Sequence, residues 1–273
     1  MNLHRKREKR YMESSQVSVK ILLLDVETAP KVSFVWRFFK ENISPKQVKE
    51  HGHLMSFAAK WLGKDKIFYE ENRKEDDKKI VAKLAALLDE ADIVVAHNGK
   101  EFDLKQIRAR AVVHRLPPPS PVKIIDTLKI AREEFGLPSN SLEYLSQVLN
   151  LKHKKTSHKK FPGFELWLEC LRKNEEAWAE LKEYNIDDVL VLEELYQVLK
   201  PWATTHPNIT VRNFDATSPL CPKCGGHHLI SRGFATTMSG VYRRYQCKDC
   251  GGWSRSRYRE NPKNENILVP QRD

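Results

Sequence analysis

The sequence has no long hydrophobic run, since none of its apolar stretches approaches the roughly 20 residues that a membrane-spanning helix requires. The first 20 residues are highly charged and hold no apolar segment of the kind found in secretion signals. We therefore expect neither membrane insertion nor secretion, and predict a cytoplasmic protein. With 273 residues, of which 40% are hydrophobic, the chain can form one main domain with a smaller accessory.

Cysteine is scarce, and four of the five cysteines form two pairs. The pairs are Cys221-x2-Cys224 and Cys247-x2-Cys250, with 22 residues between them. Segment 219–259 is near the roughly 40-residue limit below which a chain usually needs a metal or disulfides to fold. A Zn²⁺ ion on four thiolates would supply that stability, and we predict a zinc ribbon. Disulfides conflict with a cytosolic setting, and a rubredoxin-type iron site is the other metal alternative.

Acidic side chains are almost missing from residues 219–259, which hold 8 basic and 1 acidic side chain. Residues 1–20 hold 6 basic and 2 acidic side chains, whereas residues 21–218 are nearly neutral with 31 and 30. Basic ends around a neutral body favour a polyanionic partner such as nucleic acid, because phosphate neutralisation releases counterions. For residues 1–20 a solubilising surface is an equal alternative.

Aromatic and guanidinium groups are interleaved in the same C-terminal segment. Their combination suits phosphate contact together with base stacking on single-stranded nucleic acid. The alternative interpretation is a small structural domain that has a basic surface but does not bind nucleic acid. The candidate nucleic-acid contacts are Arg243, Arg244, Tyr245, Trp253, Arg255 and Arg257.

The body of the chain has the pattern of a mixed α/β domain. Val19–Glu27 predicts a central strand, because its apolar residues occupy both faces. Two further strands, at Leu54–Leu62 and Lys66–Tyr69, would complete an antiparallel meander. The following strands alternate with helices, which predicts parallel additions to the sheet. These later elements are a helix at about 75–90, strands at 93–96 and 123–126, and helices at 102–115, 127–135, 141–149, 165–171 and 175–199.

Two carboxylates stand at the end of the predicted central strand. Asp25 and Glu27 are two residues apart, so their side chains project from the same face. Burying both together is costly unless a positive charge neutralises them. A strand-end Asp-x-Glu is common by chance, and this pair is therefore a weak signal when taken alone.

Two more acids lie where the fold could bring them to the same place. Asp188 falls in the middle of the apolar stripe of the last helix, within about 40° of Leu181 and Leu195, whereas Asp187 falls on its flank. Asp103 stands near a helix start at the carboxyl edge of the sheet, where ligands of open α/β sheets collect. A simple helix N-terminal acid is the alternative reading of Asp103.

Together the four acids suit a hard divalent cation. Carboxylate oxygens are typical ligands of Mg²⁺ and Mn²⁺, which complete their shells with water and substrate phosphate. Two such ions about 4 Å apart can stabilise both the attacking and the leaving oxygen of a phosphodiester displacement. The constellation of Asp25, Glu27, Asp103 and Asp188 therefore predicts two-metal nuclease chemistry.

Three motifs occur in order along the body of the chain: Asp25-x-Glu27, Asn98-x3-Phe102-Asp103 and Tyr184-x3-Asp188. This order resembles the exonuclease motifs of the DEDD superfamily in its tyrosine-containing (DEDDy) branch, over about residues 20–202. That superfamily has a ribonuclease H-like fold and includes the proofreading domains of DNA polymerases. Neighbouring segments also resemble stand-alone exonuclease-like proteins of bacteriophages, which would place the chain in a host cytoplasm. These segments are Phe57–Trp61, Ile125–Leu128 and Tyr184–Val189.

The resemblance implies roles for individual residues. The four acids would hold the two metal ions, and Tyr184, one turn before Asp188, would orient the metal-activated water. In the histidine branch the position of Glu183 is a histidine, so the tyrosine branch is indicated. We consider Asp126 and His97 simpler structural residues of their strand ends.

The sequence thus predicts a metal-dependent 3′-to-5′ exonuclease that acts on nucleic acid, with single-stranded or 3′-ended DNA favoured only weakly over RNA. The expected parts are a basic tail (1–20), a ribonuclease H-like domain (21–202), a linker (203–218), a zinc ribbon (219–259) and a second tail (260–273). A structure-specific endonuclease on the same fold and a non-catalytic nucleic-acid-binding protein remain as alternatives. The basic loop 152–160 is either a phosphate contact or an ordinary connection.

Overall fold

A computed structural model of the chain describes residues 18–154, 160–262 and 268. Most of the basic N-terminal tail, the middle of the basic loop 152–160 and most of the C-terminal tail lie outside the described residues. The chain divides into two compact units, one formed by Lys20–Gln197 and the other containing the described residues from Val198 on.

The larger unit is built on a five-stranded mixed sheet with the order β5-β4-β1-β6-β7. β4 pairs antiparallel with both β1 and β5, whereas β6 runs parallel to β1 and to β7. The predicted meander, the parallel additions and the central place of the first strand are therefore confirmed. The strands are β1 (Ile21–Thr28), β4 (Leu54–Trp61), β5 (Ile67–Glu71), β6 (Ile93–Ala96) and β7 (Lys123–Asp126).

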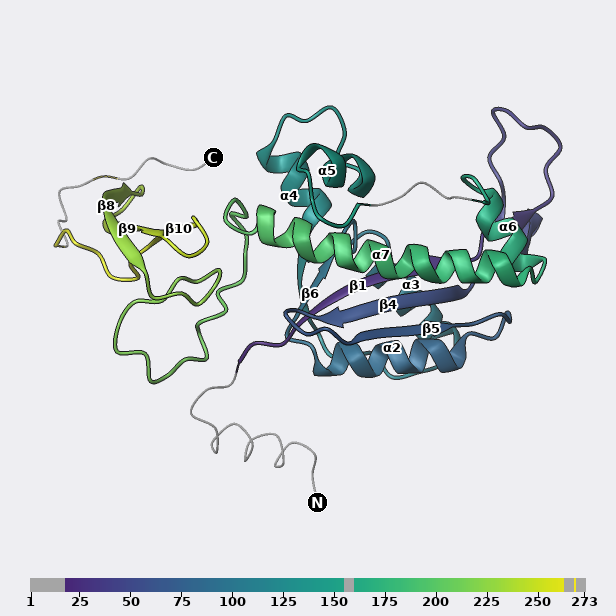
Figure 1. Cartoon of the computed structure of the whole chain (residues 1–273), viewed down its shortest axis with the longest axis horizontal. Helices are drawn as coiled ribbons and strands as arrows, with labels where there is room; N and C mark the ends of the chain where they lie inside the picture. Colours follow the sequence, from purple (N-terminus) through teal and green to yellow (C-terminus); the bar gives the residue numbers. More distant parts are fainter. Residues whose placement is uncertain (1–17, 155–159, 263–267, 269–273) are drawn as a thin grey trace, which may run out of the picture. The chain divides into compact units, whose positions relative to one another are not determined.

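Helices cover both faces of this sheet. Figure 1 shows α7 lying across one face and α2 lying against the other. Most expected helix bounds agree with the structure to within two residues. The helices are α2 (Lys78–Glu90), α3 (Asp103–Val113), α4 (Thr127–Glu134), α5 (Leu142–Val148), α6 (Glu165–Leu171) and α7 (Glu175–Leu199).

Strand β1 is buried on both of its faces. Leu22, Leu23 and Leu24 have no exposed surface, as expected for a strand covered on both sides. Leu22, Leu24 and Val26 belong to the core that β1 shares with α2 and α3. Because successive side chains of a strand point to opposite faces, residues 25 and 27 face the side of the sheet that α7 covers.

The segment between β1 and β4 forms a small structure that the sequence did not indicate. It contains a short antiparallel pair, β2 (Val32–Ser33) with β3 (Val48–Glu50), and a 3₁₀ turn at Pro45–Gln47. The backbone N–H of Ala29 donates to the carbonyl of His53 at 2.8 Å and closes the base of the segment. The segment therefore leaves the end of β1 and returns to the same edge.

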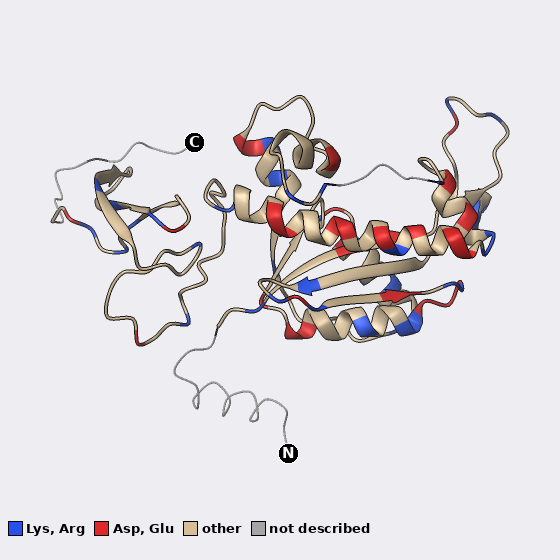
Figure 2. Ribbon diagram, in the orientation of Figure 1, with Lys and Arg blue, Asp and Glu red and all other residues tan. Residues whose placement is uncertain are grey.

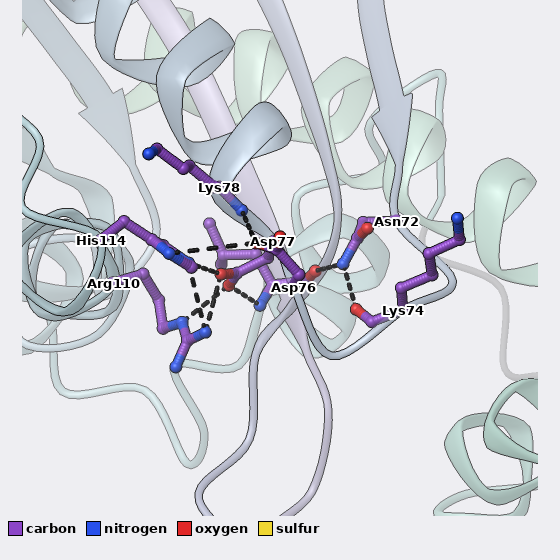
Figure 3. Close-up of polar contacts among 8 residues, drawn as sticks. Asn72, Lys74, Asp76, Asp77, Lys78, Arg110 and His114 are labelled. Atoms are coloured by element: carbon purple, nitrogen blue, oxygen red, sulfur yellow. Dashed lines mark hydrogen bonds and ion pairs between the residues drawn. The ribbon is translucent and has the colours of Figure 1, made fainter.

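A buried carboxylate joins three elements of the larger unit (Figure 3). Asp77 has no exposed surface, and it accepts hydrogen bonds from the backbone N–H of Leu54 at 2.7 Å and from two nitrogens of Arg110 at 2.8 Å each. His114 also bonds to it. Burial raises the pKa of Asp77, but these hydrogen bonds outweigh burial and hold the pKa below its usual value. Asp77 is the N-cap residue of α2, which begins at Lys78, later than the expected start at Glu75.

The smaller unit contains a three-stranded antiparallel sheet with the order β10-β9-β8. Its strands are β8 (Leu229–Thr236), β9 (Val241–Cys247) and β10 (Trp253–Arg255). β8 and β9 form a hairpin arm between the two cysteine pairs. The register of that hairpin shifts between Ser231 and Phe234. Gly233 lies at this shift with φ of +77°, a left-handed backbone conformation that favours glycine. Within the described part of the chain, no helix combines the length and apolar character needed to cross a membrane.

We expect Asp77→Ala to lower the free energy of unfolding by about 3 kcal/mol, because it leaves a mostly buried Arg110 without its carboxylate. Urea denaturation at pH 7 measures this change. Because the pKa of Asp77 is lowered in the folded state, its contribution is complete above about pH 4 and is lost as the pH falls further. Glu75→Ala, two residues away with an exposed side chain, is the matched control and should change stability by under about 0.5 kcal/mol. Equal effects of the two changes would contradict the role given to Asp77.

Candidate active site

Three carboxylates from two elements meet at one end of the larger unit's sheet. Asp25 and Glu27 project from β1 toward α7, and Asp188 projects from α7. If one carboxylate oxygen is taken from each of the three residues, these oxygens all lie within 4.8 Å of one another. Asp188 is only 3% exposed, and Asp187 beside it is half-buried. The structure thus brings together three of the four acids that the sequence singled out.

Asp103 lies beside this group without joining it. It is the first residue of α3, and its Oδ1 accepts a hydrogen bond from the backbone N–H of Val26 at 3.1 Å. It is 3% exposed. Burial raises the pKa of Asp103 to about 7, and the nearby charge of Asp126 raises it as well. The Val26 contact places Asp103 against the part of β1 that lies between the other two acids.

An indole connects Glu27 with the predicted catalytic tyrosine. Nε1 of Trp167, on α6, donates to Oε2 of Glu27 at 3.0 Å. The Trp167 ring also meets the Tyr184 ring edge to face, with 6.1 Å between centroids and 84° between planes. Trp167 therefore fixes one carboxylate of the group and packs against Tyr184. Sequence reasoning missed it, because a tryptophan in a short amphipathic helix is ordinary core material.

A buried amide holds the other strand carboxylate. Asn185 has no exposed surface, and its Nδ2 donates to Oδ2 of Asp25 at 2.6 Å. Its Oδ1 accepts from the hydroxyl of Ser56, on β4, at 3.0 Å. The donor and acceptor ends of the amide are thus both used, which fixes the orientation of Asp25. The signal that could have found Asn185 is a polar residue on the buried face of α7, three positions before Asp188.

Two polar residues at neighbouring strand ends have structural partners. Asp126 accepts from the backbone N–H groups of Asn98, at 3.0 Å, and Leu128, at 3.1 Å, and caps α4. His97 bonds the Thr127 hydroxyl at 2.9 Å through Nδ1. These contacts agree with the structural roles expected for both residues.

The donor set at the carboxylate group fits a divalent metal. Its ligand atoms are all carboxylate oxygens, which Mg²⁺ and Mn²⁺ prefer. Like charges this close raise the free energy of the folded protein unless a cation balances them. Asp25, Glu27 and Asp188 could therefore hold such an ion, with Asp103 available when it is ionised.

The four cysteines of the smaller unit lie around one point. Their sulfur atoms all lie within 4.8 Å of one another. Sγ of Cys221 is 3.7 Å from that of Cys250, and Sγ of Cys224 is 3.6 Å from that of Cys247. A disulfide needs about 2.05 Å, so these distances instead fit four thiolates around a metal ion. The cluster and the three-stranded sheet together fit a zinc ribbon.

Guanidinium groups lie over aromatic rings on both faces of this small sheet. On one face Arg244 lies over Trp253 at 5.1 Å, and Arg255 over Tyr242 at 4.0 Å. On the other face Arg243 lies over the ring of Phe234, at 5.2 Å. Tyr245 is half-buried and Arg257 is exposed. Figure 2 shows Lys and Arg on these strands, in contrast to the Asp and Glu residues along α7.

The raised pKa of Asp103 predicts a pH dependence of stability in buffer without added Mg²⁺ or Mn²⁺. An acid whose pKa is raised by folding destabilises the protein as the pH rises from about 4 to about 7. Asp103→Asn keeps an acceptor for Val26 but never ionises. Urea unfolding should therefore show the variant gaining stability relative to wild type across that window, then levelling off. A difference independent of pH would mean that Asp103 ionises normally.

The contact of Asn185 with Asp25 predicts a loss of metal affinity in Asn185→Leu. Removing a partner that orients a ligand typically weakens metal binding by about tenfold or more. Calorimetric titration with Mn²⁺ measures this change. Leu195→Ala, a buried change on the same helix, is the control and should leave the Mn²⁺ affinity unchanged despite lower stability. Equal Mn²⁺ affinity of Asn185→Leu and wild type would refute the positioning role.

Comparison with known proteins places these features in a family. No curated protein matches the chain. Among solved structures, a family B DNA polymerase from the hyperthermophilic archaeon Pyrobaculum calidifontis matches with 15% identity and a TM-score of 0.50. The match covers 67% of this chain but 25% of the polymerase, so the chain spans about a quarter of that protein's length. A family model described as the RNase_H superfamily matches residues 46–200, more than half of the chain, and the chain belongs to this superfamily.

Proposed function

We propose that the chain is a metal-dependent 3′-to-5′ exonuclease of the DEDDy type. The observation that carries the proposal is the meeting of Asp25, Glu27 and Asp188 at one end of the sheet. Tyr184 lies one helical turn before Asp188, as the tyrosine-branch motif requires. Membership of the RNase_H superfamily supports a nucleic-acid hydrolase, and nucleases of this superfamily use divalent metals.

Each residue of the site has a distinct part in the proposed reaction. Asp25, Glu27, Asp103 and Asp188 hold two Mg²⁺ or Mn²⁺ ions. Bound ions of this kind stabilise the charge on the attacking and leaving oxygens of a phosphodiester. The hydroxyl of Tyr184 orients the attacking water.

The surrounding residues restrict the motion of these groups. Asn185 fixes Asp25, and Trp167 fixes Glu27 and supports the ring of Tyr184. Such partners matter because catalytic groups must be held close to their productive geometry.

The smaller unit has a separate role in the proposal. Cys221, Cys224, Cys247 and Cys250 hold a structural Zn²⁺ ion, and the sheet that they support binds nucleic acid. Stacked guanidinium and aromatic groups suit a flexible, single-stranded polyanion. The contact residues are Arg243, Arg244, Tyr245, Trp253, Arg255 and Arg257. We also propose the division of the chain that the sequence predicted. Its parts are a basic tail (1–20), a ribonuclease H-like domain (21–202), a linker (203–218), a zinc ribbon (219–259) and a second tail (260–273).

The exonuclease proposal predicts that Asp188→Asn reduces cleavage to the background of the assay, because a metal ligand is lost. The measurement is shortening of 5′-labelled single-stranded DNA and RNA by purified protein with Mg²⁺ or Mn²⁺. Asp187→Asn, one residue away and half-buried, is the matched control and should cleave like wild type. Binding of the oligonucleotide by Asp188→Asn should persist. Cleavage by Asp188→Asn at the wild-type rate would refute the site assignment.

A circular single strand separates the proposal from its endonuclease alternative. An exonuclease has no end to start from and leaves the circle intact, whereas an endonuclease opens it. Wild-type protein that cleaves neither the linear nor the circular substrate, yet binds both, would support the non-catalytic alternative.

The proposed role of the smaller unit predicts a weaker salt dependence of binding in the Arg244→Gln/Arg255→Gln double variant. Each lost phosphate contact on a single strand lowers the slope of log K against log salt by about 0.7. Fluorescence anisotropy at several salt concentrations measures both affinity and slope. The Lys105→Gln/Lys129→Gln pair, on α3 and α4, is the matched control and should change neither value. An unchanged slope for the arginine variant would mean that the small sheet does not contact phosphate.

A further inference from the structure

A loop that the proposed chemistry does not use exposes several large apolar side chains. Phe34 is 69% exposed, Trp36 and Phe38 are each 93% exposed, and Phe39 is 84% exposed. We call residues 32–44 the aromatic loop. Exposed apolar groups gathered in this way mark interaction sites, because water disfavours them on a free surface.

Polar contacts of Glu41 within the aromatic loop and of Gln47 just after it hold the loop backbone. The carboxylate of Glu41 accepts from the backbone N–H of Trp36 at 3.0 Å and of Arg37 at 2.7 Å. The side-chain amide of Gln47 donates to the carbonyl of Phe34 at 3.1 Å and to Glu41 at 2.9 Å. The exposed aromatic side chains therefore extend from a loop whose backbone is held by hydrogen bonds.

The aromatic loop follows closely, in the sequence, the strand that carries two of the three carboxylates. β1 carries Asp25 and Glu27, and the loop leaves it just past Thr28 and returns through the bond from Ala29 to His53. Figure 1 shows the loop, in purple, rising from this end of the sheet. The indole of Trp167 on α6 reaches Glu27 at the same end. The aromatic loop thus starts five residues after Glu27, at the same end of the sheet as the carboxylates.

The charge of the aromatic loop and its flanks favours a polyanion. Glu41 is committed to the loop's own backbone, and Glu50 lies beside Lys49 at 3.8 Å. The basic side chains outnumber these two acids, and all of them belong to exposed residues. They are Lys31, Arg37, Lys40, Lys46 and Lys49.

We infer that the aromatic loop binds the bases of a single strand of nucleic acid whose 3′ end lies at Asp25, Glu27 and Asp188. The inference rests on the proposed exonuclease function and adds the residues that bind its single-stranded substrate. Unpaired bases offer their ring faces to Trp36, Phe38 and Phe39, while Arg37 and Lys40 contact phosphates. Bases inside a duplex are already stacked on one another, so the loop selects single strands with little regard to base identity.

The test compares two triple variants of the full chain in an Asp188→Asn background, so that bound substrate is not cut. One variant changes Trp36, Phe38 and Phe39 to Leu, and the other changes them to Tyr. Leu keeps apolar surface without a ring face, whereas Tyr keeps the ring. Anisotropy with a labelled 20-nucleotide strand, as DNA and as RNA, should give about tenfold or greater loss of affinity for the Leu variant. The Tyr variant should bind nearly as well as the parent.

Cleavage by the same variants without the Asp188 change separates the two proposals. For the Leu variant, kcat/KM should fall on the 20-nucleotide strand and stay unchanged on a dinucleotide, which is too short to reach the loop. Wild-type protein that cleaves neither substrate would refute the exonuclease function. A Leu variant that binds and cleaves the 20-nucleotide strand like wild type, while wild type is active, would overturn the role of the loop alone.

A second measurement needs no variant. Photo-crosslinking of wild-type protein to a single strand containing 5-iodouracil should give adducts within residues 32–40. Adducts confined to other segments would overturn the inference. So would a change of Trp36, Phe38 and Phe39 to Ser that abolishes binding to anionic lipid vesicles but leaves the affinity for the single strand unchanged, because the loop would then serve a membrane surface.

Discussion

Like charges held close together in a protein need a cation, and this constraint governs the larger unit. Asp25, Glu27 and Asp188 come within 4.8 Å of one another at a covered edge of the sheet. Their meeting requires β1 to be central and buried on both faces, so that alternate residues face α7. It also requires α7 to carry an acid within its apolar stripe. A divalent ion bound between them would offset this electrostatic cost.

Hydrogen bonds from neighbouring elements determine how these acids are presented. Asn185 bridges Asp25 on β1 and Ser56 on β4, and Trp167 ties Glu27 to α6. Each contact joins a catalytic candidate to a different part of the fold. The orientation of the acids therefore depends on the packing of the sheet with α6 and α7, and the aromatic loop extends from that same edge.

Much of this arrangement follows from sequence periodicity. The apolar run of β1 indicated a central strand, and helical angles separated Asp188 from Asp187. The partners Asn185 and Trp167 could not be found in this way, because each contact joins residues at least 140 positions apart. The aromatic loop was missed for another reason: its shape depends on hydrogen bonds of Glu41 and Gln47, which no periodic pattern encodes. Asp77 is likewise held by contacts with Arg110 of α3 and the backbone of β4 that a sequence pattern does not show.

The central claim is that the carboxylate group holds divalent metal ions. Crystals of the full chain grown with Mn²⁺ and measured for anomalous scattering at a manganese-sensitive wavelength test it most directly. The account predicts anomalous peaks bounded by the carboxylates of Asp25, Glu27 and Asp188. Crystals that contain ordered Mn²⁺ elsewhere, with none at these three side chains, would contradict it.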